Sequence, residues 1–60
     1  MIRVEKFIDN EWCVYSWHEN MVNAVINAEV ANQNGKYDAR VIENGLITLF
    51  IEGGKSNAER

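Results

Sequence analysis

Residues 37–51 read Tyr-Asp-Ala-Arg-Val-Ile-Glu-Asn-Gly-Leu-Ile-Thr-Leu-Phe-Ile, and this stretch decides the fold. The pair Asn44-Gly45 separates two runs rich in β-branched and aromatic residues, 37–42 and 46–52. Asn-Gly between such runs is a strong hairpin signal, because both residues accept the positive φ angles of a tight turn. The stretch therefore predicts an antiparallel hairpin.

Two registers of this hairpin compete. A two-residue loop would place Arg40 opposite Leu49 and Asp38 opposite Ile51, which mixes charge into the apolar face. A three-residue loop, 43–45, with Gly45 as a left-handed bulge residue gives a uniform apolar face. Its pairs are Val41 with Ile47, Ala39 with Leu49 and Tyr37 with Ile51. We therefore predict the second register, whose solvent face carries Asp38, Arg40, Ile42, Leu46, Thr48 and Phe50.

Toward the N-terminus, residues 2–8 and 12–17 predict a first hairpin. In the first run Ile2, Val4 and Ile8 share one parity, and Arg3, Glu5 and Phe7 share the other. Asp9-Asn10 is a turn signal, and the second run supplies aromatic residues that suit a strand. Two inward-facing sets remain open for that run, Trp12-Val14 and Cys13-Tyr15-Trp17.

Between the hairpins, residues 20–34 predict a helix that Asn20 caps and Gly35 ends. Its bulky stripe consists of Val22, Val25, Ile26 and Val30, and smaller residues continue the stripe sideways: Met21, Ala24, Ala28 and Ala31. Two interpretations stay open. Either the wide stripe wraps into a curved sheet, or one part faces the sheet and the other faces a second chain. Glu29 falls in this stripe and is expected to form an ion pair with Arg40 or Lys6.

The order of elements predicts an α+β domain, ββαββ, in which two hairpins join into one antiparallel sheet with the helix packed on one face. The 60 residues suffice for one domain, expected over 1–52, and the polar residues 53–60 are expected to form a flexible tail. Which strands meet at the centre of the sheet is not predicted.

The composition argues against chemistry that depends on metals, cofactors or disulfides. Cys13 is the only cysteine and His18 the only histidine, so neither an internal disulfide nor a recognisable zinc site is expected. Their separation of five is odd, which on a regular strand points them to opposite faces. We therefore expect no catalytic site. No apolar run approaches transmembrane length, and the lone thiol suits the reducing cytoplasm.

Six aromatic side chains in so short a chain cannot all share one face of a regularly alternating sheet, so some are expected outside. Exposed aromatic residues are common anchors for protein partners. The expected binding patch lies on the sheet face away from the helix and comprises Tyr15, Trp17, Arg40, Leu46 and Phe50. The leading hypothesis is a non-enzymatic protein-binding module.

Two alternatives belong to other classes. One is a nucleic-acid-binding accessory protein that uses Arg3, Lys6, Lys36 and Arg40, although the net charge of −3 disfavours binding to phosphate backbones. The other is a structural homodimer, because a domain this small gains stability from association.

The pattern also resembles small phage-encoded host-takeover inhibitors, including compact anti-CRISPR proteins. The features that carry the resemblance are a short hairpin, an Ala-rich helix ending at Asn34-Gly35, the run 37–47, and the exit Glu52-Gly53-Gly54-Lys55. The resemblance implies a cytoplasmic protein of ββαββ order that blocks a host defence or nucleic-acid-processing complex sterically.

Overall fold

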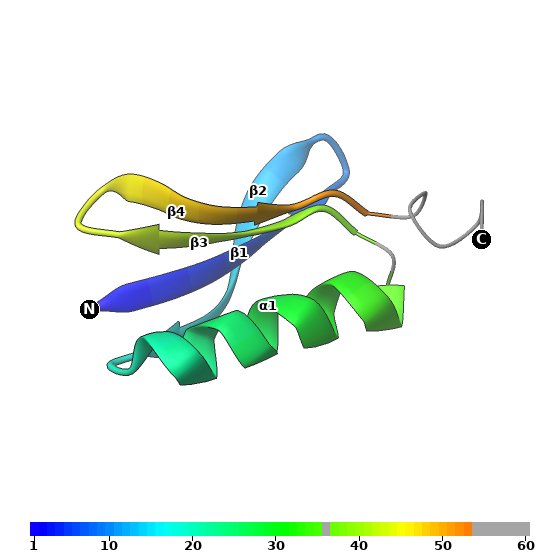
Figure 1. Cartoon of the computed structure of the whole chain (residues 1–60). Helices are drawn as coiled ribbons and strands as arrows, with labels where there is room; N and C mark the ends of the chain where they lie inside the picture. The colour runs from blue at the N-terminus through cyan, green and yellow to red at the C-terminus, as the bar shows by residue number, and fades with distance from the viewer. Residues whose placement is uncertain (36, 54–60) are drawn as a thin grey trace.

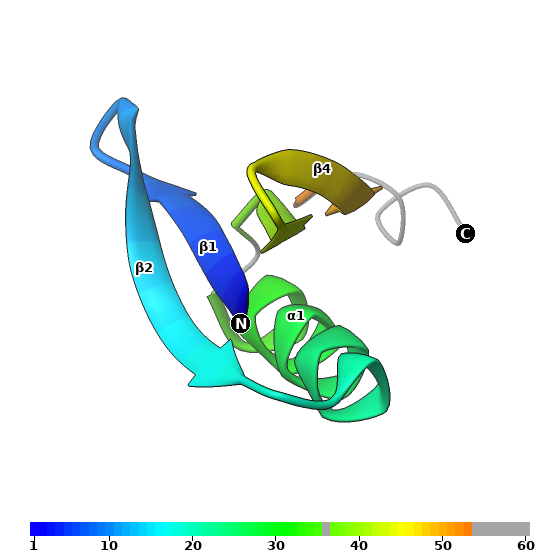
Figure 2. The same ribbon diagram turned by 90° about the vertical axis from the view of Figure 1, so that its left-hand side faces the viewer.

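The computed structural model describes residues 1–35 and 37–53, and it confirms the predicted ββαββ order (Figure 1). The elements are β1 (Ile2–Ile8), β2 (Glu11–His18), α1 (Met21–Gly35), β3 (Ala39–Glu43) and β4 (Leu46–Ile51). The helix lies across one face of the sheet and leaves the other face uncovered (Figures 1 and 2). We call the uncovered side the helix-free face.

The two hairpins join through their first strands. The strand order is β2-β1-β3-β4, and every neighbouring pair is antiparallel. At the centre of the sheet Val4 pairs with Val41, and both side chains are fully buried. The sheet is strongly curved, and β1 and β2 bend around one side of the helix (Figure 2). This arrangement leaves β2 and β4 as the two edge strands.

The first hairpin contains an extra residue in β2. Asp9 and Asn10 form the turn with φ angles of 54° and 69°, as their side chains predict. Val4 pairs with Ser16 but Glu5 pairs with Val14, so Tyr15 is left over as a β-bulge. The bulge changes the phase of the strand and places three side chains together on the helix-free face: Trp12, Val14 and Trp17. The expected inward set Trp12-Val14 is therefore wrong, and the set Cys13-Tyr15-Trp17 is right only for Cys13, because each set assumed regular alternation.

The predicted register of the second hairpin is wrong. The strands leave the Asn44-Gly45 turn as a two-residue loop, with Glu43 opposite Leu46 and Ile42 opposite Ile47. The register then shifts so that Val41 pairs with Leu49, Arg40 with Phe50 and Ala39 with Ile51. The extra residue is thus Thr48 in the strand, and not Gly45 in the turn. The shift still pairs Val41 with Leu49 and Ala39 with Ile51. These pairs form an apolar face, as the predicted register also did. Ile47, however, is 55% exposed.

Side-chain hydrogen bonds fix both ends of the helix. Asn20 caps the N-terminus as predicted, because its Oδ1 accepts hydrogen bonds from the backbone N–H groups of Val22 (2.7 Å) and Asn23 (3.3 Å). Gly35 is the last helical residue, whereas the sequence predicted an end just before it. Farther along, Asn32 Nδ2 donates to the carbonyl oxygens of Tyr37 and Glu52, which fixes this end of α1 to the strand ends.

Ala24, Ala28 and Ala31 are buried against the sheet, whereas Val22 and Ile26 are 65% and 50% exposed. The bulky stripe is therefore not the core face, because alanine lets the helix approach the curved sheet closely. Of the two interpretations left open, the first is therefore wrong, because the wide stripe does not wrap into the sheet.

Glu29 is exposed on this outer side of the helix. The expected ion pair of Glu29 with Arg40 or Lys6 is not formed. The carboxylate that binds Arg40 is Glu5.

The core is made of small side chains. It consists of Ile2, Val4, Ala24, Ala28, Ala31, Ala39 and Val41, with Met21, Leu49 and Ile51 packed partly buried against it. Val4 and Val41 are its largest fully buried side chains. Burial of apolar surface contributes about 25 cal/mol per Å², so a core of alanines and valines provides little stabilisation. Much of the apolar surface of this chain therefore lies outside the core.

Of the tail expected at 53–60, only Gly53 belongs to the described residues. Its N–H donates to Asp38 Oδ1 at 2.6 Å, so this residue is held against the start of β3.

Candidate binding face of the sheet

The cross-strand pairs define which side chains share the helix-free face. From β1 it carries Arg3, Glu5 and Phe7, and their partners in β2 are Trp17, Val14 and Trp12. From β3 it carries Arg40 and Ile42, and their partners in β4 are Phe50 and Ile47. Four of the apolar side chains are at least half exposed: Val14 (50%), Trp17 (55%), Ile47 (55%) and Phe50 (52%). This face is therefore apolar and aromatic around a charged centre.

Three rings and one guanidinium form a cluster near the turn of the first hairpin. The ring centroids of Phe7 and Trp12 lie 5.2 Å apart, and those of Trp12 and Phe50 lie 6.2 Å apart. The Arg40 guanidinium lies 3.9 Å from the centre of the Trp12 ring. Trp12 and Phe50 belong to opposite edge strands, so the curvature of the sheet brings the two edges together on this side. The cluster fixes the positions of rings that remain accessible to a partner.

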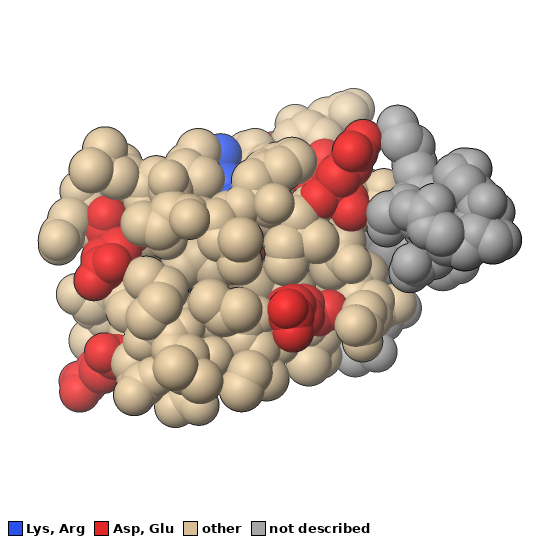
Figure 3. Space-filling model, in the orientation of Figure 1, with Lys and Arg blue, Asp and Glu red and all other residues tan. Residues whose placement is uncertain are grey.

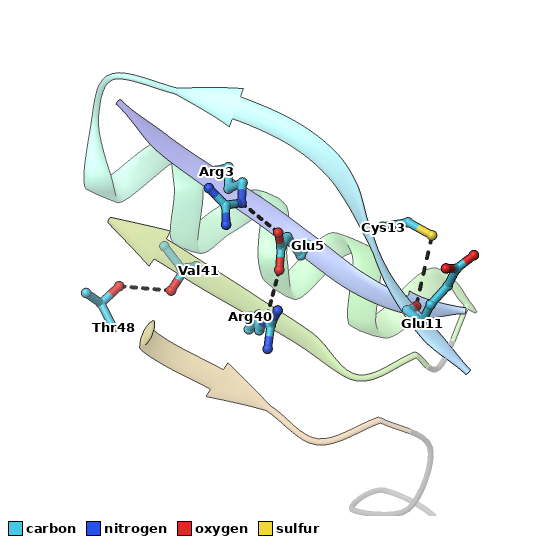
Figure 4. A network of polar contacts seen from close by, with 7 residues as sticks. All are labelled: Arg3, Glu5, Glu11, Cys13, Arg40, Val41 and Thr48. Carbon is cyan, nitrogen blue, oxygen red and sulfur yellow. Dashed lines mark hydrogen bonds and ion pairs between the residues drawn. The ribbon is translucent and has the colours of Figure 1, made fainter. Parts of the chain in front are cut away.

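A three-residue ionic network occupies the centre of the face (Figure 4). Glu5 Oε2 accepts a hydrogen bond from Arg3 Nε at 2.6 Å, and Oε1 accepts one from Arg40 Nε at 2.7 Å. Glu5 is only 6% exposed, whereas the two arginine side chains are 35% and 22% exposed. Both carboxylate oxygens are thus used inside the sheet, and the guanidinium groups reach its surface.

The electrostatic environment favours the ionised form of Glu5. Burial by itself raises the pKa of the Glu5 carboxyl, but the hydrogen bonds and positive charges of Arg3 and Arg40 outweigh burial, so the pKa lies below its ordinary value. The network therefore carries two positive charges and one negative charge at neutral pH.

The structure brings together three of the five residues expected in the binding patch. Trp17, Arg40 and Phe50 lie on the helix-free face. Leu46 pairs with Glu43, which places it on the opposite side at the tip of the second hairpin, where it is 69% exposed. Tyr15 is the bulge residue, and its ring lies 4.9 Å from Lys6 Nζ, away from the other three.

Sequence reasoning missed several residues of this face, and the missing signal differs between them. Arg3, Glu5 and Phe7 already share one parity in the sequence, so only their pairing with β3 was lacking. Trp12 and Val14 join Trp17 through the Tyr15 bulge, and no turn residue or glycine marks that bulge in the sequence.

Cys13 and His18 do not form a reactive pair. The bulge places them on the same side of β2, contrary to the expectation of opposite faces, because their partners Lys6 and Ile2 share one parity. Those partners are four residues apart, a separation of about 13 Å along a strand. His18 Nε2 instead hydrogen-bonds Ser16 Oγ at 2.7 Å. Over residues 1–35 and 37–53, no three His, Cys, Asp or Glu side chains gather closely enough to hold a metal ion.

The fold and this face define a two-layer α+β domain with an open aromatic sheet surface. No protein-family model matches the chain, and no significant match was found among the curated proteins or the solved structures. No helix in the described part of the chain has both the length and the apolar character needed to span a membrane.

Proposed function

We propose that the protein is a non-enzymatic protein-binding module whose helix-free face covers a surface of its partner. The observation that carries the proposal is the exposure of Val14, Trp17, Ile47 and Phe50 together on that face, each at least half exposed. Interface centres are enriched in aromatic residues and arginine, and this face supplies both. Binding there would exclude other molecules from the covered surface of the partner.

The proposed partner belongs to a host defence or nucleic-acid-processing complex in the host cytoplasm. The resemblance of the sequence pattern to small phage-encoded inhibitors supports this target. Under this proposal the protein acts sterically and needs no cofactor. The exposed apolar side chains of the face and the ring cluster beside its charged centre are the features that support a protein surface as the target.

The test replaces side chains on β2, at one edge of the face. A Val14→Ser, Trp17→Ala double variant should capture its partner at least tenfold less than the wild type, measured by quantitative mass spectrometry of proteins retained from a lysate of the cells in which the protein occurs. Val22→Ser, Ile26→Ala is the matched control, because it removes similarly exposed apolar groups from the helix. Circular dichroism checks that both variants remain folded. Equal capture by the β2 variant and the wild type would refute the proposal.

Single-stranded nucleic acid is the second candidate ligand, because bases also stack on exposed rings beside arginine. Two observations weigh against it. Arg3 and Arg40 are bound to Glu5, and Lys6 lies near the rings of Tyr15 and Tyr37 on the other side of the sheet. Lys36 lies outside the described residues.

A salt titration separates the two candidates. Binding of a labelled oligonucleotide that weakens steeply with salt concentration would favour nucleic acid, since affinity for phosphates depends on counterion release. Retention of a protein partner that changes little with salt would favour the protein-binding proposal.

A further inference from the structure

The outer edge of β4 is a second candidate interaction surface, and two residues of this strand, Ile47 and Phe50, also belong to the helix-free face. β3 is the only strand beside β4 among the described residues, so no described strand pairs with the backbone N–H and C=O groups along the outer edge of β4. Such an edge is a template for another extended strand, and proteins normally protect it with charged residues, proline, β-bulges or very short strands. β4 reads Leu-Ile-Thr-Leu-Phe-Ile and has six residues without a charge, a proline or a glycine. An uncharged edge of this kind favours pairing with another strand.

The side chains of β4 are compatible with β4 of a second copy as the partner strand. We propose that two copies pair antiparallel through β4 about a two-fold axis near Thr48 and Leu49, which joins their sheets into one. In this register Phe50 lies opposite Ile47 of the second copy, and Ile51 lies opposite Leu46 of the second copy. Phe50 and Ile47 both belong to the helix-free face, whereas Ile51 and Leu46 both belong to the other. These four apolar side chains therefore each meet an apolar side chain on the same face, and Thr48 lies opposite Leu49 at the axis.

The incomplete core beside β4 supports the same pairing. The helix packs mainly across β1 and β3, so Leu49 and Ile51 are only partly buried. Leu46, the first residue of β4, is 69% exposed. A second copy would place its own Leu46 against Ile51 and would extend the small core across the axis. This is the kind of association that a domain of this size uses for stability.

The surface on this side of the molecule is compatible with self-association. Figures 1 and 2 together place β4 toward the viewer of Figure 3, and uncharged side chains cover most of the surface seen there, with acidic groups scattered among them. The Thr48 bulge increases the local twist of β4. Because the second copy carries the same bulge, both edges twist equally and can remain matched over their short length.

The other edge strand is less suited to this role. β2 begins with Glu11, carries Ser16 and His18, and bends around the helix. Charged and polar residues in an edge strand oppose pairing with a second chain. The proposal is therefore specific to β4.

Sedimentation equilibrium of the full chain tests the proposal. The wild type should sediment as a dimer of twice 6.9 kDa at sub-millimolar concentration. Ile47→Lys should sediment as a monomer, because it places a charge opposite Phe50 of the second copy at two symmetry-related positions of the ladder. The matched control Val22→Lys puts the same charge on a similarly exposed position of the helix and should remain a dimer. Circular dichroism confirms that each variant is folded, and Leu46→Lys provides a second edge variant should Ile47→Lys unfold.

A mixed sample of isotope-labelled and unlabelled chains tests the register. It should show nuclear Overhauser effects between the Phe50 ring of one copy and the Ile47 methyl groups of the other. A monomeric wild type, a dimer that survives both edge variants, or a dimer that Val22→Lys dissociates would overturn the proposal. The Val14→Ser, Trp17→Ala variant lies on the opposite edge and should stay dimeric, so failure of partner binding and failure of pairing are distinguishable.

Discussion

Glu5 shows how a single buried side chain organises the helix-free face. It is buried in the sheet, and Arg3 on the same strand and Arg40 on β3 each donate to one of its oxygens. The carboxylate therefore links β1 to β3, the two strands through which the hairpins join. A buried charge whose partners are removed is costly, so the three residues act as a unit.

Replacement of Glu5 by glutamine should destabilise the fold at neutral pH. Glutamine keeps the shape and one acceptor but loses the charge, and hydrogen bonds to charged groups contribute about 1.5–3 kcal/mol each before solvent exposure reduces them. We expect a loss of about 1–3 kcal/mol in the free energy of unfolding, measured by urea denaturation. Glu11→Gln, an exposed acid on β2, is the control and should change stability little.

The same network makes stability depend on pH. The pKa of Glu5 is lower in the folded chain than its ordinary value, so the unfolded chain binds the proton more tightly and protonation favours unfolding. The contribution is therefore complete above the ordinary carboxyl pKa and is lost as pH falls through the lower pKa of the folded state. The stability difference between wild type and Glu5→Gln should shrink over that acidic range. A difference that stays constant from neutral pH to below that range would contradict this account.

At the scale of elements, the helix packs in a way that its hydrophobic stripe did not predict. Bulk suggested Val22, Val25, Ile26 and Val30 as the core face, but the strongly curved sheet accepts the alanine face instead. Sequence periodicity locates an apolar stripe, and it does not say whether large or small residues fit the surface opposite. That surface is created only when the two hairpins join.

Enlarging an alanine of the helix should therefore disturb the fold more than shortening an exposed valine. Ala28 is fully buried against the sheet, and additional methylene groups in a packed core cost about 1–3 kcal/mol. Ala28→Leu should lower the free energy of unfolding by that amount. Val22→Ala should change it by less than about 0.5 kcal/mol, since Val22 lies on the exposed side. If chemical denaturation gave the reverse order, the orientation of α1 would be wrong.

Some features of the strands and turns could be predicted from the sequence, and others could not. The turns at Asp9-Asn10 and Asn44-Gly45, the Asn20 cap and the parity of β1 follow from local backbone preferences and alternation. Both bulges escaped prediction, because Tyr15 and Thr48 are ordinary strand residues whose extra position depends on the neighbouring strand. Since each bulge changes the phase of half a strand, the composition of the helix-free face was predicted for Trp17, Arg40 and Phe50 but not for Trp12 and Val14.

At the scale of the whole molecule, the small core and the uncharged β4 edge connect stability to association. If two copies pair through β4, folding and pairing are linked by mass action, because the second copy binds the folded chain and not the unfolded one. The melting temperature of the wild type should then rise with protein concentration. Ile47→Lys should melt lower and at a temperature independent of concentration. Differential scanning calorimetry over a hundredfold range of concentration measures both.

The bulge at Tyr15 has a consequence for how such a protein can change during evolution. Loss of the Tyr15 codon would restore regular alternation in β2 and would leave Val14 opposite Glu5 and Ser16 opposite Val4, so the indole of Trp17 would stay on the open surface. The bulge thus lets β2 carry one residue more than β1 without exchanging the faces of the residues on either side. A change of chain length at this position would then be tolerated, and point substitutions on the open surface would be the route to a new target.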